Sequence, residues 1–177
     1  MVAINIETDR LILKNLNVED ISIDYVNWLN DPNINKYLNS AGSVQTMESC
    51  TSYVESFQNI EEKSLLGIWL KKESLHIGNL TLSLDIRRNL GVTGVSLGRR
   101  ECMGKGLGME ALVGLRNYCF EQIKLHRLEA YVSEKNIDST KLFLRSGFKV
   151  EGLLRESELM DGKYHDAYLL SVLESDL

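Results

Sequence analysis

Residues 92–112, VTGVSLGRRECMGKGLGMEAL, decide the fold because they place a glycine-rich loop between a strand and a helix. The segment 92–97 predicts a short strand. From Met109 a helix is expected, and its apolar residues form one stripe: Leu112, Leu115, Cys119, Phe120 and Ile123. The glycines between these two elements let the backbone turn tightly and direct N–H groups at an anion. The loop therefore predicts a phosphate-binding site.

Three kinds of phosphate ligand compete for this loop. A nucleoside-triphosphate P-loop needs GxxxxGK followed by Ser or Thr, but Gly98 is one residue too far upstream and no hydroxyl follows Lys105. Residues 106–111 satisfy the dinucleotide pattern GxGxxA, and Glu129 lies about 20 residues further on. However, one strand–helix–strand unit is too little for a full dinucleotide-binding oxidoreductase domain. The dinucleotide ligand therefore stays as the weaker alternative, and the third candidate, a coenzyme pyrophosphate, comes only from the family resemblance described below.

Around this centre, the spacing of apolar residues predicts an α/β protein with a mixed sheet. The expected strands are 6–16, 65–71, 76–84, 92–97, 127–133, 148–154 and 166–173. The expected helices are one capped by Asn17 or Asp20 and stopped at 30–32, one at about 46–59, one from Met109, and one at 138–146.

Length and composition indicate one domain over residues 1–177. Of the 177 residues 44% are hydrophobic, and no low-complexity or proline-rich linker interrupts them. The net charge of −5 argues against nucleic-acid binding. No apolar run is long enough to cross a membrane and no signal peptide is evident, so a soluble, cytoplasmic protein is expected.

Cysteine and histidine give no metal or disulfide pattern. Three cysteines lie far apart without a CxxC pair, and we expect them to be reduced thiols. Three histidines are equally scattered, with no HExxH motif. The sequence therefore predicts no metal site.

Four segments in order resemble the GNAT superfamily of N-acetyltransferases, in its RimJ/RimL-like branch (ribosomal-protein-alanine acetyltransferase-like). They are CMGKGLGMEAL (102–112), LHRLEAYVSEKN (125–136), DSTKLFLRSGF (138–148) and EGLLRESELMDGKYHD (151–166). TDRLILKNL (8–16) and WLNDPNINKYL (28–38) are also similar to that branch, so the resemblance spans nearly the whole chain.

The resemblance implies a fold, a reaction and a cofactor site. It implies a single GNAT domain whose mixed sheet has about 6–7 strands, splayed between strands 4 and 5, with about four helices. It also implies an N-acetyltransferase in which a primary amine attacks the thioester of acetyl-CoA directly. The cofactor-binding residues that it implies are the backbone groups of Val95 and Leu97, the loop residues Met103, Gly104, Lys105, Gly106, Leu107 and Gly108, and the side chains of Asn136 and Ser139. Asn136 and Ser139 also fit a simpler role as turn and cap residues.

The chain departs from the family pattern where the family carries its polar groups. Met103 stands where the loop usually has Arg or Gln, so that phosphate charge would come from Lys105, or from Arg99 and Arg100. Phe143 replaces a tyrosine that protonates the leaving thiolate, and Val92 replaces a glutamate base.

Other groups are therefore candidates for catalysis: Ser96, Tyr131, Glu129 and, on an earlier strand, His76. A packing or surface role is the simpler interpretation of each of them. Positioning with water-mediated proton loss, or an acetyl-CoA-binding sensor or partner protein with little turnover, would account for the same losses. A covalent route through Cys102 is disfavoured, because no histidine is near it in sequence.

The acceptor is expected to be a protein N-terminus or a small-molecule amine. Residues 30–43 and 161–166, with the first two helices, are the segments predicted to bind it. The acidic first helix and the net charge of −5 suit a cationic acceptor. The oligomeric state is left open, a homodimer included.

Overall fold

A single eight-stranded sheet runs through the computed structural model of this chain, which describes residues 4–38, 40–58, 60–160 and 162–177. Its strands are β1 (Asn5–Glu7), β2 (Leu11–Asn15), β3 (Lys63–Leu70), β4 (Leu75–Asp85), β5 (Leu90–Leu97), β6 (Arg127–Ser133), β7 (Lys149–Met160) and β8 (Lys163–Leu173). The α-helices are α1 (Ile23–Leu29), α2 (Pro32–Asn35), α3 (Met47–Gln58), α4 (Leu107–Tyr118) and α5 (Ile137–Arg145).

The sheet has the order β1-β2-β3-β4-β5-β6-β8-β7. Every neighbouring pair is antiparallel except β5 and β6, which are parallel and joined through α4. This crossover is the strand–loop–helix–strand unit that the glycine-rich segment predicts. The predicted mixed α/β sheet is therefore confirmed.

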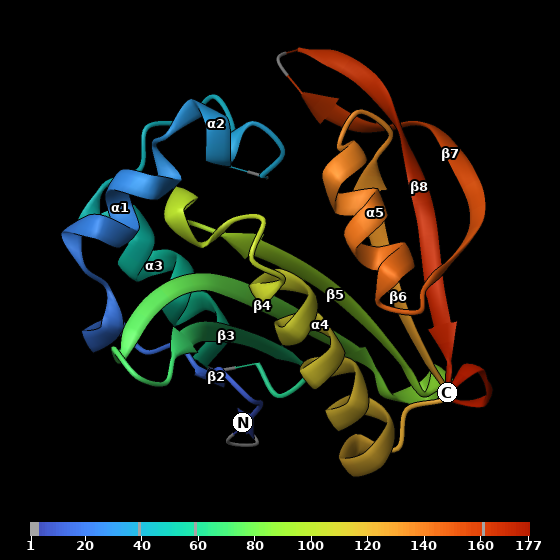
Figure 1. Cartoon of the computed structure of the whole chain (residues 1–177). Coiled ribbons are helices and arrows are strands. Elements are labelled where there is room, and N and C mark those ends of the chain that lie inside the picture. The colour runs from blue at the N-terminus through green and yellow to red at the C-terminus, as the bar shows by residue number, and fades with distance from the viewer. Residues whose placement is uncertain (1–3, 39, 59, 161) are drawn as a thin grey trace.

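The sheet splits between β5 and β6. Three residue pairs join them, with Leu90, Gly91 and Val92 opposite Arg127, Leu128 and Glu129. By contrast, β5 pairs with β4 along its whole length, from Leu90 to Leu97. Figure 1 shows β5 and β6 close together near the C-terminus and diverging from there. The predicted splay between the strands at 92–97 and 127–133 is confirmed.

Apolar side chains fill both faces of the sheet. On one face α4 and α5 cover the larger core, whose members include Leu80, Leu82, Leu112, Leu115 and Leu128. On the other face α1 and α3 cover a smaller cluster that includes Tyr25, Trp28 and Val54. Leu80 and Leu82 share the first face, as alternation along β4 predicts.

The strand count is eight rather than 6–7, partly because the predicted strand 6–16 is two strands. Thr8 breaks it: its backbone N–H donates to the Leu11 carbonyl at 3.0 Å, and its Oγ1 accepts from the Leu11 N–H at 3.1 Å. These bonds close a tight turn, after which β2 pairs back on β1.

The helix count is five rather than about four. The first helix starts later than predicted: Ser22 caps α1 by accepting from the Tyr25 N–H at 3.2 Å, whereas Asn17 and Asp20 belong to a 3₁₀ turn. Pro32 ends one helix and begins another, because proline suits the first position of α2, which Asp31 caps. No helix in the described ranges is long and apolar enough to cross a membrane.

Candidate active site

The backbone of β5 faces the opening between β5 and β6. The N–H of Gly98 donates to the Ile77 carbonyl at 2.8 Å, which fixes the alternation of this antiparallel pair. By that alternation the backbone groups of Thr93, Val95 and Leu97 turn away from β4. Beyond Val92, no strand in the described part of the chain pairs with them. Val95 and Leu97 thus present backbone groups where the sequence places the cofactor arm.

Ser96 points to the opposite face from Val95 and Leu97, whose side chains pack on the larger core. It is half-buried and lies opposite Asn79 of β4. The Asn79 side-chain N–H donates to the Tyr25 hydroxyl at 3.1 Å. The side-chain oxygen of Asn79 lies 3.0 Å from His76 Nε2. Ser96 therefore adjoins a polar pair on the α1 and α3 face.

His76 is not at the opening. Its ring is buried and stacks on Trp69, with 4.6 Å between centroids, and on Tyr25 at 5.6 Å. Desolvation lowers the pKa of His76, although the bonds to Asn79 and Gly78 oppose that shift. We assign it a packing role.

The glycine loop is built to expose its backbone. Gly104 and Gly106 have φ values of +71° and +77°, a conformation that side-chain-bearing residues rarely adopt. Residues 103–106 are exposed, and Gly106 caps α4 without a side-chain hydrogen bond. The first N–H groups of a helix lack intrahelical partners, so an anion placed here would meet them. These features fit a pyrophosphate.

Leu107 and Gly108 lie in the first turn of α4, so the helix begins two residues before the predicted Met109, and both are buried. A Cβ on Gly108 would lie 3.0 Å from Leu142 Cδ1. This glycine therefore serves the close packing of α4 on α5, whereas Gly104 and Gly106 serve the loop.

Two of the three candidate cations are already paired. Arg99 Nη2 lies 2.7 Å from Asp24 Oδ2, and Arg100 makes two hydrogen bonds to Asp31, at 2.6 and 2.8 Å. The Arg100 guanidinium holds the pKa of the Asp31 carboxyl well below its usual range. Lys105 is exposed and has no ion pair with a residue that the structure describes. Of the three, Lys105 is the one whose charge no described residue neutralises, so it is the candidate that fits a phosphate contact.

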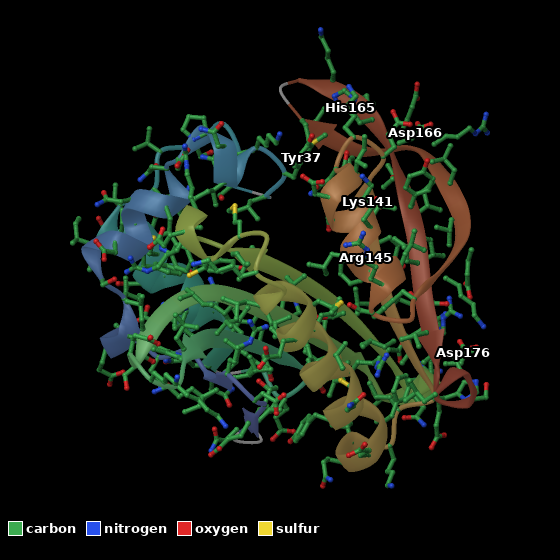
Figure 2. The ribbon with its side chains drawn as sticks, viewed as in Figure 1. Tyr37, Lys141, Arg145, His165, Asp166 and Asp176 are labelled. Carbon is green, nitrogen blue, oxygen red and sulfur yellow. The ribbon has the colours of Figure 1, made fainter. Side chains whose placement is uncertain are left out.

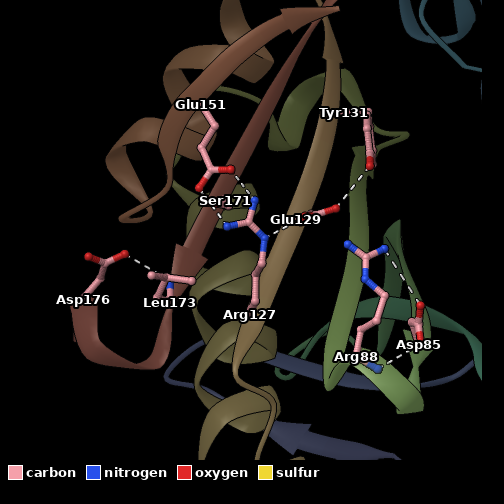
Figure 3. Close-up of polar contacts among 9 residues, drawn as sticks. All are labelled: Asp85, Arg88, Arg127, Glu129, Tyr131, Glu151, Ser171, Leu173 and Asp176. Atoms are coloured by element: carbon pink, nitrogen blue, oxygen red, sulfur yellow. Dashed lines mark hydrogen bonds and ion pairs between the residues drawn. The ribbon is translucent and has the colours of Figure 1, made fainter.

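Glu129 and Tyr131 form a hydrogen-bonded pair on β6 (Figure 3). The Tyr131 hydroxyl donates to Glu129 Oε2 at 3.1 Å, and Arg127 Nε donates to Glu129 Oε1 at 2.6 Å. Glu129 is buried, while Tyr131 is 49% exposed. Desolvation and the Glu129 carboxylate raise the pKa of Tyr131.

Arg127 also binds Glu151, whose Oε1 accepts from Ser171 at 2.6 Å. These donors lower the pKa of Glu151 to about 2. One arginine thus joins two carboxylates, and the cluster keeps a formal charge of −1 at the closed end of the opening (Figure 3).

Phe143 and Cys102 are both buried. Phe143 is 2% exposed and packs edge-on against Phe148, with 5.0 Å between centroids. The Cys102 thiol is 4% exposed, and desolvation raises its pKa. Neither group is suited to chemistry at the opening.

Asn136 and Ser139 lie together at the start of α5. The Asn136 side-chain oxygen accepts from the Ser139 N–H at 3.2 Å, which caps the helix. The simpler role that the sequence allows is therefore present. The buried Ser133 hydroxyl, three residues before Asn136, has no partner among the residues described.

Two of the segments predicted to bind the acceptor, the one that carries Tyr37 and the one that carries His165 and Asp166, lie at one end of the molecule (Figure 2). Figure 2 shows Tyr37, beyond α2, at the same end as His165 and Asp166 of β8. The Tyr37 hydroxyl donates to the Lys135 carbonyl at 2.9 Å, which links this segment to the loop before α5. Asn39 and Asp161 lie outside the described residues.

The contact of Arg10 with Glu110 of α4, at 2.6 Å, has no signal in the sequence. The two residues are 100 positions apart, and neither is unusual for its local element. The described residues hold no group of three or more His, Cys, Asp or Glu side chains placed to bind a metal ion.

Comparison with known proteins gives the family. Residues 10–149 match the model of the acetyltransferase (GNAT) domain. An uncharacterized N-acetyltransferase, p20, of Bacillus licheniformis is 31% identical over 176 residues, covering 96% of each chain. The [ribosomal protein uS5]-alanine N-acetyltransferase of Escherichia coli is 34% identical over 106 residues, which are 60% of this chain and 54% of that protein. The structure of a GNAT-family acetyltransferase from Bacillus anthracis superposes with a TM-score of 0.86 at 20% identity, covering 97% and 99% of the two chains. This chain belongs to the GNAT family of N-acetyltransferases, which take their acetyl group from acetyl-CoA.

Proposed function

We propose that this protein transfers the acetyl group of acetyl-CoA to a primary amine by direct attack of the neutral amine on the thioester. The observation that carries the proposal is the opening between β5 and β6, beside the exposed glycine loop. Family membership supports acetyl-CoA as the donor.

The donor is held mainly by backbone groups. Val95 and Leu97 pair with the pantetheine arm as a neighbouring strand would, because their backbone groups face the opening. The amides of residues 103–108 hold the pyrophosphate at the N-terminus of α4. Asn136 and Ser139 contact the cofactor arm near the start of α5.

The reaction forms a C–N bond and breaks the C–S bond of the thioester, so the amine loses one proton and the thiolate gains one. Donors along β5 would stabilise the oxyanion that develops. We assign both proton transfers to Tyr131 and Glu129, since a hydrogen bond already joins their side chains and Tyr131 is half-exposed. Tyr131 takes the amine proton while passing its own to Glu129, and the reverse transfer protonates the thiolate.

A protein N-terminal amine is the acceptor that we favour. The ribosomal-protein-alanine acetyltransferase relative supports it, and the net charge of −5 suits a cationic acceptor. A small-molecule amine is the alternative that the same chemistry allows.

Thiol release from acetyl-CoA tests the proposal and its acceptor. We expect release with a peptide that has a free N-terminal alanine and none with the same peptide acetylated at its N-terminus. Release with spermidine alone would move the acceptor to small amines. Saturable binding of acetyl-CoA without thiol release for any amine would instead identify an acetyl-CoA sensor.

The loop is tested by Gly106→Val, measured by calorimetric titration with CoA. A side chain at φ +77° strains the loop, so we expect binding to be lost. Gly162→Val is the matched control, because Gly162 has φ +70° and open space around it, away from the loop. Equal CoA affinity in the two variants would contradict the proposal that the loop binds the pyrophosphate.

A further inference from the structure

The turn between β1 and β2 is hydrogen-bonded to the start of α4. Glu110, in the first turn of α4, accepts from the Thr8 hydroxyl at 2.6 Å, from the Arg10 N–H at 2.7 Å and from Arg10 Nε at 2.6 Å. Burial would raise the pKa of Glu110, but these hydrogen bonds prevail and lower it. Glu110 is therefore a carboxylate, and its negative charge lies at the helix end where the phosphates are proposed to bind.

Arg10 also reaches the loop itself. Its Nη1 donates to the Lys105 carbonyl at 3.0 Å. In a planar trans peptide the carbonyl and the following N–H point in opposite directions, so this bond turns the Gly106 N–H away from Arg10. One guanidinium thus fixes the orientation of the Lys105–Gly106 peptide and offsets the charge of Glu110.

We infer that Arg10 is a positioning residue for the pyrophosphate of acetyl-CoA. It acts through the Lys105–Gly106 peptide and through Glu110, from the turn between β1 and β2, which is far from the loop in sequence. The inference rests on the proposed placement of the donor in the loop. A lysine cannot replace it fully, because one ammonium group does not reproduce the fork that binds a carboxylate and a carbonyl together.

The test compares two ligands that differ in the pyrophosphate. Arg10→Ala should weaken CoA binding about tenfold to a hundredfold by calorimetry, the range expected for losing charge-assisted hydrogen bonds. Binding of S-acetylpantetheine, which lacks the pyrophosphate, should stay unchanged by ligand-observed NMR. The KM for acetyl-CoA should rise while kcat changes little. Lys71→Ala is the matched control, since Lys71 pairs with Glu7 on the same N-terminal segment at 3.1 Å and does not touch the loop.

Two further variants keep the inference open to refutation. Arg10→Lys keeps the charge and should give a CoA affinity between those of Arg10→Ala and the unmodified protein. Adding Glu110→Gln to Arg10→Ala should recover part of the CoA affinity, because it removes the negative charge of Glu110 that Arg10 no longer offsets. Unchanged CoA affinity in both Arg10 variants, or an equal loss for S-acetylpantetheine, would overturn the inference. An unmodified protein that does not bind CoA would instead overturn the proposed function.

Discussion

Val92 of β5 and Glu129 of β6 are the last residues paired across the opening, and paired residues of parallel strands point to the same face. Val92 stands where the resemblance to the GNAT superfamily implies a glutamate base. The strand register therefore places the Glu129 carboxylate of β6 next to the position of Val92. Its partner Tyr131 lies two residues further along the same face of β6.

Tyr131→Phe should lower kcat about a hundredfold or more, because general acid–base catalysis typically contributes about that much. The CoA affinity should stay unchanged, since the hydroxyl does not hold the cofactor in the proposed arrangement. Steady-state kinetics with acetyl-CoA and the best amine measure the first quantity, and calorimetry measures the second. Glu129→Gln should have a similar effect, and the double variant should lose no more than either single one.

Tyr118→Phe is the control for this pair, because Tyr118 lies at the C-terminal end of α4, outside the glycine loop and outside the segments predicted to bind the acceptor. It should leave kcat unaltered. An undiminished kcat in Tyr131→Phe would remove Tyr131 from the mechanism and favour proton loss through water.

The elements around the opening could be predicted from sequence because their signals are local. The strand 127–133 matches β6 residue for residue, and four of the five residues of the apolar stripe after the loop are buried, with Ile123 partly buried. Gly104 and Gly106 likewise predict the loop, since residues other than glycine rarely adopt its positive φ angles.

Relationships across strands could not be predicted in the same way. Register places Glu129 beside Val92, and packing of the first hairpin on α4 places Arg10 beside Glu110. Neither contact leaves a periodic trace in the sequence. The pairing of Arg99 and Arg100 with carboxylates near α1 was missed for the same reason.

Gly98→Ala should destabilise the protein. An ideal Cβ at this position would lie 0.5 Å from Trp28 Cε3, and Trp28 is buried. Forcing the indole and α1 to move is an overpacking change, which typically costs about 1–3 kcal/mol. A urea titration should show the lower free energy of unfolding. Gly152→Ala is the control, since nothing lies within 4 Å of its Cβ position, and comparable destabilisation in both would contradict the steric argument.

The stability of the protein should fall as the pH drops below about 6.5 because of His76. Burial lowers the pKa of His76, so the unfolded chain binds protons in a range where the folded chain does not. The free energy of unfolding therefore decreases with falling pH, by at most about 1.4 kcal/mol per pH unit from this one group. The loss continues until the pH reaches the lowered pKa of the folded state.

His76→Gln removes this titration, so its unfolding free energy should depend less steeply on pH between 5 and 6.5 than that of the unmodified protein. His126→Gln is the control, because His126 is exposed. If the pH dependence were the same with and without the His76 imidazole, some other group would have to carry it.

Lys105 rather than Arg100 should supply charge to the phosphates of the donor. Arg100 already binds Asp31 through two hydrogen bonds, and moving it to the phosphates would break the ion pair of that carboxylate. Lys105 is exposed within the loop and needs to break no ion pair with a described residue. Lys105→Ala should therefore weaken CoA binding by about threefold to tenfold, and the loss should shrink at high salt because an exposed charge is screened. Arg100→Ala should change the affinity by less than about twofold, a small effect typical of exposed charges. A larger effect from Arg100→Ala than from Lys105→Ala would mean that the pair with Asp31 opens when the donor binds.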